Sequence, residues 1–277
     1  MSAAGPAVRV VLCTSGGCFG ALVLQQLLAS PGCEVVGVVR STRVLRPRYG
    51  WLQGALAQVR LSGWRYAAYL GAVSTLAELP AAGGALPGLH AQAAASGLPL
   101  LSTRDLNQPP GQDWLRRLRP DLLVSGFFNQ RLDDATCALA RAGAVNIHPS
   151  LLPRDKGVDP VFFGRLRGAE RFGVSVHRVV AALDAGPVLA QRVVAAASDD
   201  SVFRLTARLF QQGAQLLTGQ LDAILNGACG TPQAGEGNYD SWPTPAEVAA
   251  LRRRGVALLR FRDLLELRRG RLLAPTA

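Results

Sequence analysis

The segment from Ala144 to Pro149, which reads Ala-Val-Asn-Ile-His-Pro, is the sequence feature that most constrains the fold. Its apolar residues predict the end of a buried parallel strand, and Pro149 restricts His148 to extended backbone. Asn146 and His148 are two residues apart, so their side chains point to the same face of that strand. Ligands of open α/β sheets bind at the carboxyl ends of the strands. This segment therefore predicts a polar site at that edge.

Short apolar runs alternate with helical patterns, which predicts an α/β fold with a Rossmann-like, doubly wound and mostly parallel sheet. Near its end, residues 172–180 and 188–195 predict an antiparallel hairpin with Asp184 near its tip. A long amphipathic helix is expected over 201–225, and a capped helix is expected between Asp159 and Gly168. The other expected strands are 8–13, 34–40, 98–102 and 121–127, and the other expected helices are 21–29, 87–96 and 112–118.

A turn formed by Ser15, Gly16 and Gly17 follows the first predicted strand. The dinucleotide fingerprint is not met, because Ser15 occupies its first glycine position and Arg40, not an acidic residue, ends the next strand. Backbone N–H groups at a helix start, with Arg40 nearby, suit a phosphate or carboxylate. A plain connecting turn with Arg40 in solvent is an equal alternative.

Residues 1–226 are expected to form one domain, and residues 227–277 a short C-terminal extension. Within the domain, residues 43–84 predict a helical insertion that is broken at Ser62-Gly63. Its apolar stripe over 51–79 either packs on the core or forms a homodimer contact. The extension contains a capping box that begins at Thr244 and starts a helix, and two short elements are expected over 256–262 and 263–268.

The formal charge of +11 raises the question of nucleic acid binding. Lys156 is the only lysine, and the arginines are scattered without a basic-aromatic motif, so a solvated arginine-rich surface is the favoured interpretation. Five cysteines without a C-x-x-C pair predict reduced thiols, neither disulfides nor a zinc site. A run of about 18 apolar residues is absent, as is a signal peptide pattern, and we expect a cytoplasmic protein.

Asn-x-His-Pro-Ser-Leu-Leu-Pro over 146–153, followed by Gly157 and by Leu-Asp-Ala-Gly-Pro over 183–187, resembles the formyltransferases that use 10-formyltetrahydrofolate. That family includes glycinamide ribonucleotide formyltransferase and the catalytic domain of methionyl-tRNA formyltransferase. The resemblance covers residues 8–225 and rests on two separate motifs in the family's order. The turn over 153–157 departs from the family's pattern. This departure bears on which amine is the substrate and leaves the expected chemistry unchanged.

The resemblance implies a catalytic group of Asn146, His148 and Asp184. Asn146 would hold the formyl oxygen, His148 would stabilise the oxyanion, and Asp184 would orient His148 and relay the amine proton. Taken singly, Asn146 also reads as a strand-end cap and Asp184 as a turn residue. The chemistry requires no metal, and none is expected. We interpret His177, on the first hairpin strand, as structural.

Two further sets of residues follow from the same resemblance. The apolar members of the folate set are equally compatible with plain core packing. The expected folate-binding residues are Gly126, Phe127, Phe128, Asn129, Gln130, Leu132, Leu183 and Gly186. The expected residues for the amine substrate are Ser15, Gly16, Gly17, Arg40 and Lys156.

The expected activity is transfer of the formyl group of 10-formyltetrahydrofolate to the amine of a small molecule, whose identity stays open. Methionyl-tRNA formyltransferase activity is an alternative, but an extension of roughly fifty residues is too short for the barrel-like RNA-binding domain of those enzymes. A formyltetrahydrofolate hydrolase is another, although its relatives carry a regulatory domain for which no residues precede Val8. An inactive folate-binding or interaction module is disfavoured because all three polar residues are present.

Overall fold

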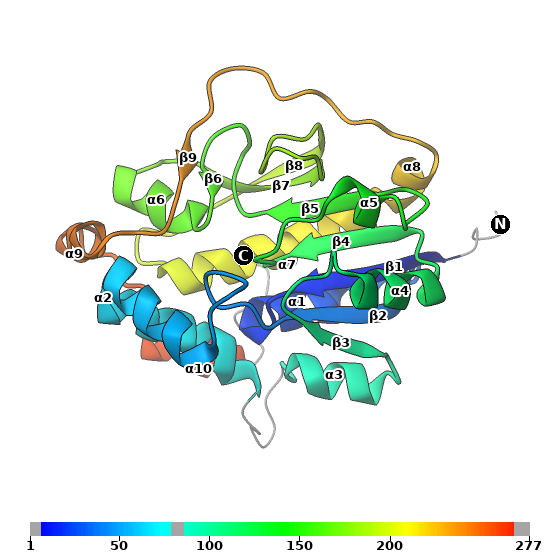
Figure 1. The fold of residues 1–277 in the computed structure, drawn as a ribbon. Helices are drawn as coiled ribbons and strands as arrows, with labels where there is room; N and C mark the ends of the chain where they lie inside the picture. The colour runs from blue at the N-terminus through cyan, green and yellow to red at the C-terminus, as the bar shows by residue number, and fades with distance from the viewer. Residues whose placement is uncertain (1–6, 79–85, 269–277) are drawn as a thin grey trace.

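The computed structural model describes residues 7–78 and 86–268. Seven strands form one sheet in the order β3-β2-β1-β4-β5-β7-β8 (Figure 1). The first five in that order are parallel, β7 pairs antiparallel with β5, and β8 pairs antiparallel with β7, so the predicted fold class is confirmed. The strands are β1 (Val8–Thr14), β2 (Cys33–Ser41), β3 (Leu100–Thr103), β4 (Leu122–Gly126), β5 (Ala144–His148), β7 (Phe172–Arg178) and β8 (Val188–Val194).

Helices cover both faces of this sheet, which is why its strands are apolar on both sides. In β1, Val10 and Leu12 belong to one buried apolar cluster, whereas Val11 and Cys13 belong to the other. The helices are α1 (Gly17–Leu28), α2 (Trp51–Thr75), α3 (Leu89–Ala95), α4 (Pro109–Leu118), α5 (Asp134–Cys137), α6 (Pro160–Arg167), α7 (Val202–Thr218), α8 (Leu221–Leu225), α9 (Pro245–Arg253) and α10 (Phe261–Arg268). Two short strands, β6 (Lys156–Gly157) and β9 (Tyr239–Asp240), pair outside the main sheet.

The predicted helix caps are confirmed. The Asp159 side chain accepts a hydrogen bond from the N–H of Phe162 at the start of α6, and Gly168 ends the helix with a φ of 73°. In α9, Thr244 and Glu247 form the reciprocal capping box. These caps fix the ends of the two helices that flank the polar edge of the sheet.

Two sequence predictions near the C-terminus are wrong. The helix expected over 201–225 is two helices, because α7 ends before Gly219, a poor helix former, and α8 begins at Leu221. The element expected over 256–262 is absent, and α10 begins only at Phe261. Residues 256–260 instead supply carbonyl groups that accept hydrogen bonds from the first N–H groups of α7.

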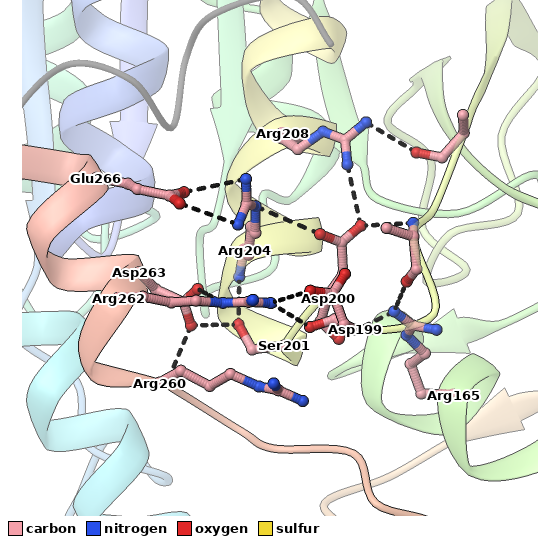
Figure 2. A network of polar contacts seen from close by, with 12 residues as sticks. Arg165, Asp199, Asp200, Ser201, Arg204, Arg208, Arg260, Arg262, Asp263 and Glu266 are labelled. Atoms are coloured by element: carbon pink, nitrogen blue, oxygen red, sulfur yellow. Dashed lines mark hydrogen bonds and ion pairs between the residues drawn. The ribbon is translucent and has the colours of Figure 1, made fainter.

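Polar contacts fasten α10 to the start of α7 (Figure 2). The fully buried Asp263 accepts hydrogen bonds from the Ser201 hydroxyl at 2.6 Å and from the backbone N–H of Arg260 at 2.8 Å. Arg262 pairs with the carboxylate of Asp199 at 2.7 Å. The last described helix is therefore held to the domain by charged groups as well as by apolar contacts.

The insertion contains the predicted break, since Gly63 has non-helical backbone angles inside α2. The helix after the break is packed, and its Tyr66 is 1% exposed. The helix before the break leaves Trp51 at 74% and Leu56 at 51% exposure. Residues 79–84 of the expected insertion lie outside the described residues. The homodimer contact stays a prediction, as does the boundary at residue 226.

If the exposed apolar side chains of α2 before Gly63 form the homodimer contact, Leu56→Glu will separate the chains, because it buries a charge in an apolar interface. Light scattering at micromolar concentration is expected to give the mass of two chains for the wild type and of one chain for the variant. Ala68→Glu adds the same charge on the other side of the break and is expected to stay dimeric. A monomeric wild type would contradict the prediction.

Candidate active site

Strand β5 brings Asn146 and His148 to the C-terminal edge of the sheet. Its antiparallel neighbour β7 places His177 opposite Asn146 and Ser175 opposite His148. The side chain of His148 is 5% exposed and that of His177 is 3% exposed. Two imidazole rings and one amide therefore share a largely dry environment, in which electrostatic interactions are strong.

The loop that follows β5 is folded back onto β7 and β8. The Ser175 hydroxyl donates to the carbonyl of Ser150 at 2.6 Å and accepts from the N–H of Leu152. Asp155 then adopts a φ of 55°, and its carbonyl oxygen lies 2.9 Å from Nε2 of His148. The loop thus supplies a hydrogen-bond acceptor for one edge of the His148 ring.

Asp184 reaches the same place from the turn between β7 and β8. Its Oδ1 lies 3.5 Å from Nδ1 of His148, and Nδ2 of Asn146 donates to that oxygen at 3.4 Å. Its Oδ2 accepts the N–H of Gly157 at 3.0 Å. The structure therefore brings together the three residues that the sequence predicted as a group, although they come from two separate segments.

His177, interpreted from the sequence as structural, lies inside this cluster. Its Nδ1 faces the carbonyl of Arg178 at 2.8 Å, so Nδ1 carries the proton, and its Nε2 accepts from Nδ2 of Asn146 at 3.1 Å. Burial and the charge of His148 lower the pKa of His177 to about 4. A neutral His177 fixes which way the Asn146 amide points. The sequence alone did not reveal this role, because it depends on the pairing of His177 with Asn146 across β5 and β7.

Both ring nitrogens of His148 face oxygen acceptors, one on Asp155 and one on Asp184. Either nitrogen can therefore donate an N–H to an oxygen atom. The two histidines thus have complementary roles: His177 accepts a hydrogen bond, whereas His148 presents donors. The site can place N–H groups of Asn146 and His148 beside one carboxylate.

Most of the predicted folate-binding residues follow β4, and Leu183 and Gly186 lie in the turn that carries Asp184. Several of their side chains are used inside the protein: the ring of Phe127 packs edge-on against Phe19 at 5.0 Å, and Gln130 is buried with hydrogen bonds to Ser41 and Leu106. Asn129 bonds to Ser41 and to Arg43, while Leu132 is 6% exposed and Phe128 packs on the second apolar cluster. Gly126 ends β4, and Leu183 is 45% exposed.

The turn of Gly186 packs so tightly that a Cβ would lie 1.9 Å from the carbonyl oxygen of Arg178. Only glycine fits there, and this packing fixes the turn that carries Asp184. The role of these residues in folate binding stays a prediction. In the backbone of residues 128–132, the N–H of Asn129 donates to the Ser15 hydroxyl and the carbonyl of Arg131 accepts from Asn107, which leaves the peptide groups of Phe128, Gln130 and Leu132 for a ligand.

The residues predicted to bind the amine substrate lie in two regions, one at the start of α1 and one in β6. Ser15, Gly16 and Gly17 form the turn before α1, where Gly16 packs against the side chain of Arg40. The Arg40 Nε is buried without a hydrogen-bond partner. Lys156 lies in β6, next to Gly157. Within residues 7–78 and 86–268, no carboxylate forms an ion pair with either cation.

The described residues lack two features that would bear on the function of the site. They contain no group of three or more His, Cys, Asp or Glu side chains that could hold a metal ion. They also contain no helix with the length and apolarity of a membrane span. A cavity of about 210 Å³ lies beside the loop after β5, lined by Ser150, Arg154 and Arg171 among others, and the three clustered polar residues are not in its wall.

Comparison with known proteins identifies the family. A family model described as "Formyl transferase" matches residues 71–221, more than half of the chain. The chain belongs to the formyl transferase family. Among curated relatives, it is 42% identical over 132 residues to the methionyl-tRNA formyltransferase of Roseiflexus castenholzii (strain DSM 13941 / HLO8), an alignment that covers 48% of this chain and 42% of that protein. The chain thus spans less than half the length of the curated relatives it matches.

Solved structures of the family share this fold. The phosphoribosylglycinamide formyltransferase of Bacillus halodurans superimposes with a TM-score of 0.54 at 18% identity, covering 79% of this chain and 96% of that one. An N-formyltransferase from Helicobacter canadensis, in complex with folinic acid and dTDP-3-aminofucose, gives a TM-score of 0.54 at 14% identity, covering 86% and 71%. At such identities the likeness establishes the fold.

His177→Gln is expected to weaken the pH dependence of stability. The pKa of His177 is about 4 in the folded protein and near 6.5 when unfolded, so between these values the unfolded state binds the extra proton. Stability therefore falls as the pH drops from 6.5 towards 4, by about 3 kcal/mol at most from this group. Urea unfolding at pH 7 and pH 4.5 measures the difference. Equal losses in wild type and variant, or a His177 NMR titration near pH 6.5, would contradict it.

Proposed function

We propose that the protein transfers the formyl group of 10-formyltetrahydrofolate to the amine of a small-molecule acceptor. The observation that carries the proposal is the convergence of Asn146, His148 and Asp184 within hydrogen-bonding reach. Membership of the formyl transferase family supports it. So does the folinic acid bound in the Helicobacter canadensis N-formyltransferase, whose fold this chain shares.

In the reaction, the amine nitrogen attacks the formyl carbon, the bond from that carbon to N10 of the folate breaks, and negative charge develops on the formyl oxygen. We place that oxygen between Nδ2 of Asn146 and Nδ1 of His148. The 3.4 Å contact from Asn146 to Asp184 is the longer of its two hydrogen bonds, so this N–H is the one free to turn to the substrate. Catalytic hydrogen bonds are often long before the substrate binds.

The carboxylate of Asp184 has two tasks in this scheme. Its Oδ1 faces His148, which keeps the ring oriented and charged, and its Oδ2 is held by the N–H of Gly157. The attacking amine must lose a proton, and the departing N10 must gain one. Asp184 accepts the first of these, through water, and His148 donates the second. The proton count is balanced once both residues return to their starting states.

The folate itself fits a backbone-lined site better than one lined by side chains. Asn129 and Gln130 are already bonded to Ser41, so their amides are not free for a pterin ring. Gly126 permits close approach of a flat ligand, and the exposed Leu183 offers an apolar wall. The co-substrate would thus be recognised through peptide groups after β4 and through the turn beside Asp184.

An anionic acceptor is favoured by the unpaired cations. The Nε of Arg40 is buried without a hydrogen-bond partner, as are those of Arg165, Arg260 and Arg262. Arg40 differs from them in its position beside the Gly16-Gly17 turn at the start of α1. A phosphate or carboxylate would give the Arg40 Nε an acceptor and would receive the N–H groups at the start of α1. We therefore propose a small amine that carries an acidic group, with Lys156 as a second contact on the catalytic side.

Transfer to methionyl-tRNA is the second candidate. The curated relatives at 42% and 40% identity are methionyl-tRNA formyltransferases, and the chain carries a charge of +11. A panel of acceptors separates the candidates: amines with phosphate or carboxylate groups, Met-tRNA, and no acceptor at all, which reveals hydrolysis. Met-tRNA as the sole effective acceptor, with salt-sensitive binding, would replace the small-molecule proposal.

Asn146→Ala, His148→Ala and Asp184→Asn are each expected to lower turnover by ~10²–10³ without unfolding the protein, because each removes a group that contacts the reacting atoms. Release of tetrahydrofolate measures turnover, and circular dichroism checks the fold. The matched control is Gln212→Ala, whose amide oxygen accepts a hydrogen bond from Arg192 and contacts none of the three residues. Variants of the cluster that keep near-normal turnover would refute the assignment.

Arg40→Met is expected to raise the KM for the acceptor by ~10–10², the value of one charge-assisted hydrogen bond, and to leave the KM for the folate unchanged. Initial rates at varied acceptor and folate concentrations separate the two. Arg117→Met removes an exposed arginine of α4 and is expected to change neither constant. An unchanged acceptor KM in Arg40→Met would show that Arg40 does not touch the acceptor.

A further inference from the structure

Residues 227–240 of the C-terminal extension run along the β8 edge of the sheet to reach the catalytic loop. The segment leaves α8, passes outside β8, and ends in β9, which pairs in parallel with β6 (Figure 1). On the way, Thr231 exchanges two backbone hydrogen bonds of 2.8 Å with Val188. We name residues 231–240 the crossing segment. It is thus fastened at both of its ends before any side chain is considered.

Gln233 of the crossing segment holds the turn that carries Asp184. Its Nε2 donates to the carbonyl of Asp184 at 2.8 Å and to that of Gly186 at 2.9 Å. The opposite amide orientation would set an oxygen against two carbonyl oxygens, so this orientation is the only favourable one. Asp184 has a φ of 50°, a conformation that a residue with a side chain keeps only when its surroundings hold it.

Asn238 holds the other loop of the site. Its Oδ1 accepts the N–H of Asp155 at 2.9 Å, and its backbone carbonyl accepts the N–H of Lys156 at 3.2 Å. Asp240 completes the clamp, because Arg167 pairs with the carboxylates of both Asp240 and Asp155. Val158, two residues after Lys156, donates its N–H to the carbonyl of Asp240 at 3.1 Å.

These two loops are the ones that orient the proposed catalytic pair. The carbonyl of Asp155 faces His148, and the N–H of Gly157 binds Asp184. We propose that the crossing segment is part of the active site, in which Gln233 and Asn238 are positioning residues that set the geometry of Asp184 and His148. This inference rests on the proposed formyl transfer, and it goes beyond it by assigning a task to the extension.

A purely structural extension is the competing explanation, and the contacts of α10 supply its control. Ser201→Ala removes a buried hydrogen bond to Asp263 and the cap of α7, yet it touches neither catalytic loop. It should lower stability alone. Gln233→Ala and Asn238→Ala should lower kcat by ~10–10² with little change in the acceptor KM, because displacement of a catalytic group by about 1 Å can cost ~10²-fold.

The experiment compares these three variants with the wild type in kcat, both KM values, melting temperature and the NMR signals of the His148 ring. The inference predicts a shifted His148 signal and a lowered kcat in Gln233→Ala and Asn238→Ala, and neither in Ser201→Ala. Should Gln233→Ala fail to fold, Asn238→Ala decides the question. A kcat that follows melting temperature alike in all three variants, with unmoved His148 signals, overturns the inference.

The ring signals also separate this inference from the proposed function. A wild-type protein that transfers no formyl group to any acceptor of the panel, and releases no tetrahydrofolate, refutes the proposed function. In that case, His148 signals that shift only in the crossing-segment variants still support the positioning role. Unmoved signals reject the role whatever the activity is.

Discussion

The carboxylate of Asp184 is the group on which the polar edge of this protein depends. Its side chain is only 13% exposed, and a carboxylate removed from water is costly unless donors surround it. The donors come from β5, through Asn146 and His148, and from the loop after it, through Gly157. Each needs its own support: His177 orients the Asn146 amide, and the carbonyl of Asp155 orients His148. The sheet topology is what allows segments this distant in sequence to meet.

Much of this architecture is readable from local sequence, because local physics decides it. A strand that ends at Pro149, a helix capped by Asp159 and Gly168, and a break at Gly63 each depend on the conformational limits of a few residues. Where contacts with a distant segment determine the local structure, the sequence alone did not predict it. In the irregular stretch 256–260, the carbonyls of Ala257 and Leu258 accept hydrogen bonds from the start of α7, and no pattern within those five residues indicates that partner.

The candidate site divides in the same way. Asn146, His148 and Asp184 were found because two motifs stand in a recognisable order, and the structure brings them within reach of one another. The role of His177 was not predicted, because it depends on the register between β5 and β7. Gln130 illustrates the converse: its position in the loop after β4 can be predicted from the sequence, but its burial against Ser41 cannot. The contributions of Gln233 and Asn238 come from a segment without a sequence signature.

The pairing of β9 with β6 also bears on how the protein is made. Asn238 follows Asp155 by 83 residues, and a Cβ on Gly157 would lie 1.9 Å from the carbonyl oxygen of Asp240. On the ribosome, the loop after β5 emerges long before the strand that lies against it. Until that strand arrives, the loop presents unpaired peptide groups, the kind of edge that chaperones cover and that aggregation exploits. Completion of this corner therefore waits until residue 240 has been synthesised.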